Sequence, residues 1–511
     1  MKRIIAILLC TLLLAGCQTE KPTYIPTGNG LYQDPTGSTE PPSVPNDTQQ
    51  TMSLGYDPTE SLNPYQTGST TNRLLFNLIY QGLFGVDETY TVHPILCKNY
   101  RVSKDMKNYT FYLEAATFPD GQVLTAEDVV ASLQCAKESL VYRSRLRDVS
   151  QIRVAEDGGV EVKLSIPYEN LPILLDIPIV KADQTADEMP QGTGAYRLEQ
   201  GQTRLWLLRR SNWWCQAKMP ITAEQIPLTE ATDAAALRDA FEFGQIRLVC
   251  ADPGTESYVD FRCDYELWDC ESGHFLYLAC NENRKIFSNK ALRTALTHAI
   301  DREMLVETYY KSYAISAYLP ASPLSPYYDT ALASQYGYDP QILAQAVAAA
   351  ELESNAVTLL VNQADGRRVR VARAIAAMLK ECGLVVTISA LSGEQYTKAL
   401  SDGNFDLHLG QTKLTANMDL TAFFATDGTL NYGGLSDVVC YSLCQEAMGN
   451  AGNYYSLHRT VMNSGMLCPI LFRSYAIYVA RGAVDDLTPA RDNLLFYTLG
   501  KDMESCKLDN G

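Results

Sequence analysis

Apolar and polar residues repeat with two different periods along this chain, and each period predicts one kind of element. In residues 160–166 (VEVKLSI) every second position is apolar, which predicts a half-buried β-strand. Residues 288–310 instead show helical spacing, with Ser288 placed to cap the helix. The apolar positions of that predicted helix are Leu292, Leu296, Ala299 and Ile300.

Residues 368–391 predict a helix followed directly by a strand. Gly383 ends the helix, because glycine tolerates the left-handed conformation that closes a last turn. Leu384, Val386 and Ile388 then alternate with other residues, as in a strand. Helical and strand patterns mix throughout the chain, so we expect an α/β fold built on a sheet.

Residues 118–130 (FPDGQVLTAEDVV) predict a tight turn and then the start of a helix. Gly121 suits a turn position with positive φ, and Thr125 is placed to cap the helix with Asp128 in capping-box position. An apolar stripe is expected at Val129, Leu133, Ala136 and Leu140. These residues fix a corner of the fold and carry no chemistry.

The first twenty residues (MKRIIAILLCTLLLAGCQTE) have the pattern of an export signal. A basic start precedes an apolar core of about 11 residues, too short to span a bilayer. The segment Leu14-Ala15-Gly16-Cys17 resembles the lipobox of bacterial lipoproteins, which implies a signal peptide over residues 1–16 and lipidation of Cys17. The alternative is an ordinary signal peptide with a coincidental cysteine. Two acyl chains would hold the protein at the extracytoplasmic face of the cell membrane.

Residues 17–50 are rich in Thr, Pro, Gly and Ser and poor in core-forming residues, which predicts a disordered tether. With 511 residues the chain is long enough for two or three domains. Its net charge of −17 argues against a nucleic-acid partner, which would require a basic surface.

The 14 cysteines show no CxxC pairs and no zinc-site spacing. Cys10 lies in the predicted signal peptide and Cys17 is the predicted lipidation site; we interpret the other 12 as small buried residues, with Cys440 and Cys444 on one helix face. Disulfides are the alternative, first of all near Cys263, Cys270 and Cys280, although their pairing cannot be read from spacing.

The sequence contains no HExxH motif, no GxSxG elbow and no phosphate-binding P-loop, so we expect neither catalysis nor a bound cofactor or metal. Gly192-Thr193-Gly194 lacks the third glycine of a dinucleotide site. Of the five histidines, His298 is expected in solvent, and His408 is either a core residue or a contact to ligand or metal.

An ordered series of segments carries a resemblance over residues 50–480. The segments are LNPYQTGSTTNRLLFNLIYQGLF (62–84), KNYTFYLE (107–114), FPDGQVLTAEDVVASL, GTGAYRLE (192–199), SNWW (211–214), LYLACNENRKIFSNKALRTALTHAIDREML (276–305), DPQILAQAVAAAEL (339–352) and the unit at 371–391. Together they resemble the family 5 extracellular solute-binding proteins of ABC importers, the group of oligopeptide, dipeptide and nickel receptors.

The resemblance implies a two-lobed clamshell of the periplasmic-binding-protein type, class II-like and enlarged by an extra domain, with discontinuous lobes joined by a hinge. Lobe 1 would comprise residues 51–272 with 470–511 returning to it, and lobe 2 residues 273–469. A solute would bind between the lobes and favour the closed form, which docks on a permease. The expected partners are a peptide or small-molecule ligand, an ABC permease with its ATPase, and the membrane through the lipid anchor, with the receptor itself a monomer.

The resemblance also suggests ligand contacts, each with a structural alternative. Thr67, Gly68, Ser69 and Thr70 would line the pocket or form a surface turn, and Tyr277 would face ligand or pack in the core. Asn431 and Tyr432, in LNYGGLSD, would contribute side-chain contacts. Arg370 and Arg373 are expected on a solvated helix face.

The stretch 405–424 departs from the pattern of the peptide receptors, where an aspartate holds the ligand's amino terminus. Gln411, Lys413 and Thr415 stand there instead, with Thr415 or Leu414 at the position of the acid and Asp419 as a substitute farther along. Lys413 would prefer an anionic group if it points inward, and otherwise is solvated. The departure puts peptide recognition in doubt. A ligand-sensing lipoprotein outside transport is the alternative function.

Overall fold

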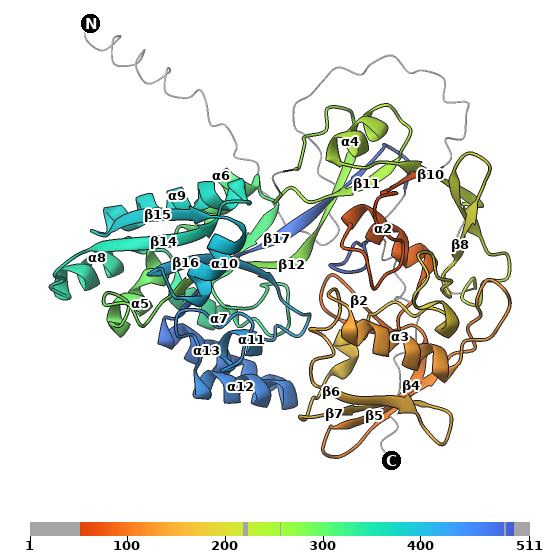
Figure 1. The fold of residues 1–511 in the computed structure, drawn as a ribbon, viewed down its shortest axis with the longest axis horizontal. Helices are drawn as coiled ribbons and strands as arrows, with labels where there is room; N and C mark the ends of the chain where they lie inside the picture. The colour runs from red at the N-terminus through yellow and green to blue at the C-terminus, as the bar shows by residue number, and fades with distance from the viewer. Residues whose placement is uncertain (1–51, 218–222, 256, 485–486, 495–511) are drawn as a thin grey trace, which may run out of the picture. The chain divides into compact units, whose positions relative to one another are not determined.

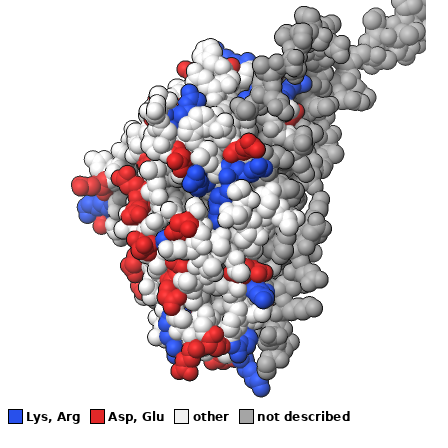
Figure 2. All heavy atoms as spheres, turned by 90° about the vertical axis from the view of Figure 1, so that its right-hand side faces the viewer, with Lys and Arg blue, Asp and Glu red and all other residues white. Residues whose placement is uncertain are grey.

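The structure is a computed structural model that describes residues 52–217, 223–255, 257–484 and 487–494 (Figure 1). The predicted signal peptide, Cys17 and the tether lie outside these residues. No helix within the described ranges is long and apolar enough to cross a membrane. On the face drawn in Figure 2, acidic and basic side chains are interspersed.

Eleven strands of the described residues form one mixed sheet in the order β15-β14-β16-β12-β17-β11-β1-β10-β9-β8, with β13 paired to β17. Their bounds are β1 (Leu54–Tyr56), β8 (Tyr196–Gln200), β9 (Leu205–Arg209), β10 (Gln225–Glu230), β11 (Leu248–Ala251), β12 (Glu266–Cys280), β13 (Ala314–Ser316), β14 (Ala356–Asn362), β15 (Val385–Leu391), β16 (Leu407–Lys413) and β17 (Leu467–Val479).

The two long strands β12 and β17 lie side by side and join the two ends of this sheet (Figure 1). They pair antiparallel from Glu266–Val479 to Ala279–Leu467, and β17 is buried along its whole length. A register shift interrupts the pairing between Glu271 and Phe275, where Gly273 has a φ of +77°. This irregularity lies beside the charge cluster described below.

Two smaller sheets complete the β-structure of the described chain: one of two strands, and one in the order β4-β5-β7-β6. Their bounds are β2 (Phe84–Val86), β3 (Val92–Pro94), β4 (Cys97–Val102), β5 (Asn108–Leu113), β6 (Val149–Val154) and β7 (Val160–Leu164). The strand predicted over 160–166 is therefore confirmed as β7, with Val160, Val162 and Leu164 buried.

The helices are α2 (Thr70–Ile79), α3 (Ala126–Glu138), α4 (Ala234–Glu242), α5 (Lys290–Leu296), α6 (Arg302–Tyr310), α7 (Thr330–Ala333), α8 (Pro340–Ala349), α9 (Gly366–Glu381), α10 (Gly393–Ser401), α11 (Thr421–Phe424), α12 (Val438–Gly449) and α13 (Tyr454–Ser464). One core lies where α5, α6, α8 and α9 pack on β14 and β16, and a larger core includes α2, α3 and the four-stranded sheet. The mixed α/β prediction is confirmed.

The helix-strand unit at 368–391 is confirmed as α9 and β15, separated by Gly383 at a φ of +94°. Arg370 and Arg373 are exposed on α9, as expected.

The corner at 118–130 is also confirmed. Gly121 has a φ of +86°, and Thr125 and Asp128 form the predicted capping box of α3. The predicted stripe is wrong at its last position, because α3 ends at Glu138 and Leu140 is 80% exposed.

The single helix predicted over 288–310 is wrong, since the structure has two helices there. Asn289, not Ser288, caps α5, and Asp301 caps α6 after the backbone turns extended at Ile300. The break lets the fully buried Arg302 donate hydrogen bonds to main-chain carbonyl oxygens at 2.9 to 3.2 Å.

The cysteine interpretation is confirmed for α12, where Cys440 and Cys444 are both buried on one face. Cys263, Cys270 and Cys280 form no disulfide with one another in the structure.

At Gly192 and Gly194 the backbone at the end of α2 lies so close that there is no room for a side chain. The N–H of Gly194 donates to the Ile79 carbonyl at 2.9 Å, and a Cβ at Gly194 would lie 2.6 Å from that same oxygen. The glycine pair therefore seats the end of α2.

Candidate functional site: a buried charge cluster

Four cationic side chains surround the carboxylate of Asp492, which is 6% exposed. Arg73 Nη2 and Lys413 Nζ lie 2.8 Å and 2.6 Å from its Oδ1. Arg145 Nη2 and Arg491 Nε lie 2.7 Å and 3.3 Å from its Oδ2. Both oxygens of this carboxylate are thus paired with charged donors, the strongest kind of hydrogen bond in proteins.

The three cations outside the segment 487–494 come from distant parts of the chain. Arg73 lies in the first turn of α2, Arg145 in the turns after α3, and Lys413 is the last residue of β16. The elements that carry two of them are well fixed: Ser69 caps α2, which carries Arg73, and β16 pairs with β12 up to Lys413.

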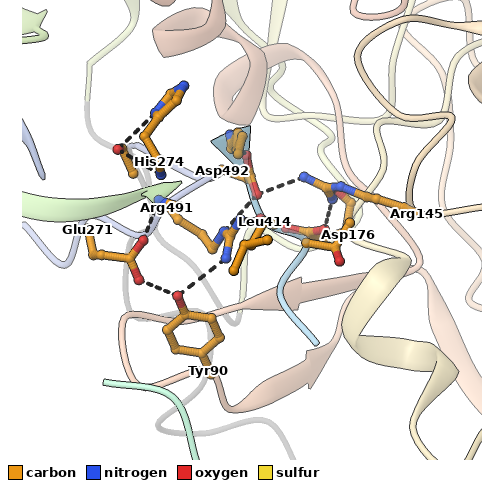
Figure 3. Close-up of polar contacts among 12 residues, drawn as sticks. Tyr90, Arg145, Asp176, Glu271, His274, Leu414, Arg491 and Asp492 are labelled. Carbon is orange, nitrogen blue, oxygen red and sulfur yellow. Dashed lines mark hydrogen bonds and ion pairs between the residues drawn. The ribbon is translucent and has the colours of Figure 1, made fainter. Parts of the chain in front are cut away.

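A second group of contacts extends the cluster (Figure 3). Arg145 also pairs with the carboxylate of Asp176, which is 3% exposed. Arg491 donates to the hydroxyl of Tyr90 at 3.3 Å, and that hydroxyl donates to the carboxylate of Glu271.

Arg491 further donates to the carbonyl oxygen of Leu414, and it fills the space above Gly273 that a Cβ would need. The register shift in β12 therefore makes room for an arginine of the segment 487–494.

The titration of the cluster follows from burial and charge. Burial opposes the ionisation of Asp492, but Lys413 and the three arginines outweigh it and hold the pKa of this carboxyl well below its usual range. Burial lowers the pKa of Lys413 to about 7, with Asp492 opposing. Burial raises the pKa of Asp176 to about 6, with Arg145 opposing. At neutral pH the carboxylate at the centre of the cluster, Asp492, is therefore fully ionised.

His274 lies at the edge of the same cluster, with its Nδ1 at 3.0 Å from the hydroxyl of Ser272. Burial first, and then the cations Arg473 and Lys413, depress its pKa well below the usual value. The ring is neutral and adds no charge.

A cavity of about 20 Å³ adjoins the cluster, enough for roughly one water molecule. Arg145 and Thr415 contribute to its wall together with Tyr168, Asn417 and Asp419. The cluster shows that Arg73, Arg145 and Lys413 can together hold a carboxylate.

A model of the bacterial extracellular solute-binding proteins, family 5, matches residues 91–431. The chain belongs to this family. Family 5 proteins are the substrate-binding components of ABC importers, and the sequence resemblance is thereby confirmed.

Solved structures of similar fold include the ABC transporter substrate-binding protein CtaP from Listeria monocytogenes. It is 18% identical with a TM-score of 0.71, covering 88% of this chain and 98% of that one. A putative peptide-binding protein, AppA, from Clostridium difficile is 16% identical with a TM-score of 0.71, covering 87% and 98%. The two-lobed α/β fold of the periplasmic binding proteins is confirmed.

Among curated proteins, the glutathione-binding protein GsiB from Salmonella typhi is 26% identical over 272 residues, 50% of this chain and 53% of the relative. The chain thus spans about half the length of the curated relatives it matches.

The family 5 loop at 67–70 supports α2. The buried Thr67 hydroxyl donates to Glu60 at 3.2 Å and accepts from the N–H of Ser69 at 3.1 Å. Gly68 is exposed, and Thr70 begins the helix. These contacts fix the start of the helix that carries Arg73, and direct ligand contact by the loop stays a prediction.

Tyr277 is 2% exposed. Its ring packs edge-on against Phe423 at 5.0 Å and covers Gly410. These are the contacts of a tyrosine packed in the core, which is the alternative given above for Tyr277.

Of the residues at the departure from the peptide-receptor pattern, Lys413 points into the charge cluster. Gln411 is half-buried on β16 opposite Leu276, and the Thr415 hydroxyl donates to Asn417 at 2.6 Å. Asp419, considered as a substitute acid, pairs with Arg147 at 2.8 Å.

Asn431 and Tyr432 lie away from Lys413. The Asn431 amide donates to main-chain carbonyls of its own loop at 3.2 Å. Tyr432 is half-buried, with its ring edge-on to His408 at 6.3 Å near the other end of β16.

His408 bonds the hydroxyl of Tyr396 at 2.7 Å, and burial lowers its pKa to about 3, so it is a neutral core residue. His298 is half-buried rather than solvated, with its Nδ1 2.9 Å from the Gly337 carbonyl oxygen.

Sequence reasoning missed Arg73, Arg145, Asp176, Arg491 and Asp492. Arg73 had a signal, since it is the one cation in the otherwise uncharged helix TTNRLLFNLI. Asp492 had none.

Proposed function

We propose that this chain is a lipid-anchored, extracytoplasmic receptor of an ABC importer that captures a peptide-like or other small solute between its two lobes and delivers it to the permease. The observation that carries the proposal is the convergence on one carboxylate of Lys413 with Arg73 and Arg145. The lysine belongs to the proposed lobe 2 and the arginines to the proposed lobe 1.

We divide the lobes at residues 272/273 and 469/470, so that lobe 1 comprises 51–272 with 470–511 and lobe 2 comprises 273–469. Both divisions fall inside the paired strands β12 and β17. Besides the ion pair of Lys413 with Asp492, contacts between the proposed lobes include a hydrogen bond from the Glu169 N–H to the Met448 carbonyl at 2.9 Å and the ion pair of Arg147 with Asp419 at 2.8 Å. Contacts of this kind favour a closed arrangement, the form in which hinge-bending receptors hold their ligands.

The named relatives suggest the range of solutes to test. GsiB is a glutathione-binding protein, AppA is a putative peptide-binding protein, and a structural neighbour from Campylobacter jejuni, NikZ, was solved with nickel and histidine.

The first experiment is a thermal-shift panel with di- to octapeptides, glutathione, free amino acids, sugars, and Ni²⁺ with and without histidine. A ligand at 100 times its Kd stabilises the native state by about 2.7 kcal/mol, which gives a clear shift. If no member of the panel shifts the transition, the receptor proposal loses its basis.

For a ligand found in this way, Gln411→Ala and Tyr432→Ala should raise Kd, whereas Gln122→Ala, at an exposed turn, should leave it unchanged. Equal affinity in all three variants would remove Gln411 and Tyr432 from the site. The anchor is tested separately by Cys17→Ser, which should release the protein from the membrane fraction.

A further inference from the structure

The segment 487–494 places an aspartate where the cationic side chains of both proposed lobes meet. Asp492 makes close ion pairs with Arg73, Arg145 and Lys413, and each of these side chains is less than a third exposed. A carboxylate held in this way has the environment expected for a bound anionic ligand.

The charge balance of the cluster favours such an anion. Among the described residues, its cations are Arg73, Arg145, Arg491 and Lys413, while the carboxylates besides Asp492 are Asp176 and Glu271. Removing the charge of Asp492 would leave three arginines, and Lys413 whenever it is protonated, with two carboxylates in a largely buried site. Buried charges without partners are strongly unfavourable, so another anion would be drawn in.

The segment that carries Asp492 is held by polar side-chain contacts and by the buried side chains of Leu487, Ala490 and Leu494. Its backbone hydrogen bonds at Ala490 and Asn493 run between these two residues, at 3.0 and 3.1 Å. Asn77 and Leu414 bind it from outside, through the side chains of Asn493 and Arg491. The polar contacts of Asp492 can be exchanged for contacts to a ligand without breaking a strand or helix, because residues 487–494 belong to neither.

A second observation beside the cluster points to a ligand. The hydroxyl of Tyr168 is buried and makes no hydrogen bond of normal length among the described residues, although the Asn417 side chain interacts with it. It lines the small cavity next to Arg145, together with Asn417. A polar group of a solute whose carboxylate replaced Asp492 could satisfy this hydroxyl.

We propose that Arg73, Arg145 and Lys413 form a receptor for a carboxylate of the solute, and that Asp492 occupies this receptor as a built-in competitor until the solute displaces it. This inference rests on the proposed function. The ligand class is a small solute with a free carboxylate, and the segment 487–494 regulates its binding.

The test uses the full chain in mild detergent, with succinate as the carboxylate probe and dimethyl succinate as the uncharged control at equal ionic strength. Asp492→Asn keeps the shape of the side chain and removes its charge. A tethered group competes at an effective concentration of about millimolar or more, so Asp492→Asn should bind succinate at least ~10-fold more tightly than the wild type. Asp492→Glu, which keeps a carboxylate, should resemble the wild type.

Equal succinate affinity in wild type and Asp492→Asn, or equal binding of the diester, would overturn the inference. Should Asp492→Asn fail to fold, hydrogen exchange of wild-type residues 487–494 decides. Faster exchange with 50 mM succinate supports displacement, and unchanged or slower exchange contradicts it. If a solute from the panel binds while these tests fail, the receptor function is supported and the role of Asp492 as a competitor is refuted. If no solute of the panel binds, the receptor function itself is refuted.

Discussion

Arg145→Met should destabilise the protein strongly, because Arg145 lies between two buried carboxylates. The guanidinium is 9% exposed, and its partners Asp176 and Asp492 are 3% and 6% exposed. Asp492 keeps Arg73 and Lys413 in this variant, whereas Asp176 loses its paired cation. Breaking a buried pair by removing one partner costs about 3–5 kcal/mol, and we expect a loss in that range at pH 8.

The loss of folding stability in Arg145→Met should depend on pH, and the titration of Asp176 decides whether the loss grows or shrinks as the pH rises. Its pKa of about 6 in the folded protein already lies above the unfolded value, so its ionisation opposes folding. That contribution is absent below about pH 4 and grows as the pH rises through the folded pKa. Without Arg145 the folded pKa rises further. The deficit of Arg145→Met should therefore be about 2 kcal/mol smaller at pH 5 than at pH 8.

Urea unfolding followed by tryptophan fluorescence at pH 5 and pH 8 measures both effects. Arg153→Met is the matched control, because the pair of Arg153 with Glu161 is at the surface, with the arginine 48% exposed, and should contribute about 0–1 kcal/mol. Adding Asp176→Asn to Arg145→Met should recover a large part of the loss at pH 8. A loss below about 1 kcal/mol at pH 8, or the same loss at both pH values, would refute the reasoning.

Three further substitutions test local features of the fold. Gly194→Ala would bring a Cβ within 2.6 Å of the Ile79 carbonyl oxygen and should lower stability by about 1–3 kcal/mol in thermal unfolding, whereas Gly68→Ala, with open space around its Cβ, should stay within about 0.5 kcal/mol. Arg302→Met would leave buried main-chain carbonyls without donors and should cost about 3–5 kcal/mol by urea unfolding; a near-neutral effect would show that water replaces the guanidinium. Thr125→Ala should cost about 1 kcal/mol through the lost cap, and an unchanged urea midpoint would contradict that role.

The elements that sequence reasoning predicted correctly are those whose signals are local. The capping box at Thr125, the alternation in β7 and the glycine end of α9 each lie within a few residues, so their physics can be read in place. The break between α5 and α6 was missed although Asp301 is a good cap. Helical spacing of apolar residues continues across the break, and the need to seat Arg302 among carbonyls is a tertiary requirement.

The candidate site likewise combines a residue with a local signal and residues that only the tertiary structure brings together. Lys413 was noticed because it stands where the peptide receptors have another pattern, but its partner Asp492 is 79 residues away and Arg73 is 419 residues from that aspartate. No spacing rule links positions so far apart, since the fold alone brings them together. For this reason the sequence leaves open whether the Lys413 side chain points inward or into solvent. In the structure it points into the charge cluster.

The position of Asp492 has a consequence for how such a receptor would respond to its solute. A site lined by cations would be unfavourable to close when empty, because closure buries the charges without partners. A built-in carboxylate relieves this cost in the absence of solute, and it reduces the apparent affinity by the fraction of molecules in which the site is already occupied. The segment 487–494 would then set the solute concentration at which the receptor is filled. Substitutions that weaken its contacts, such as those of Arg491 with Leu414 and Tyr90, should lower that concentration without touching a residue that binds the solute.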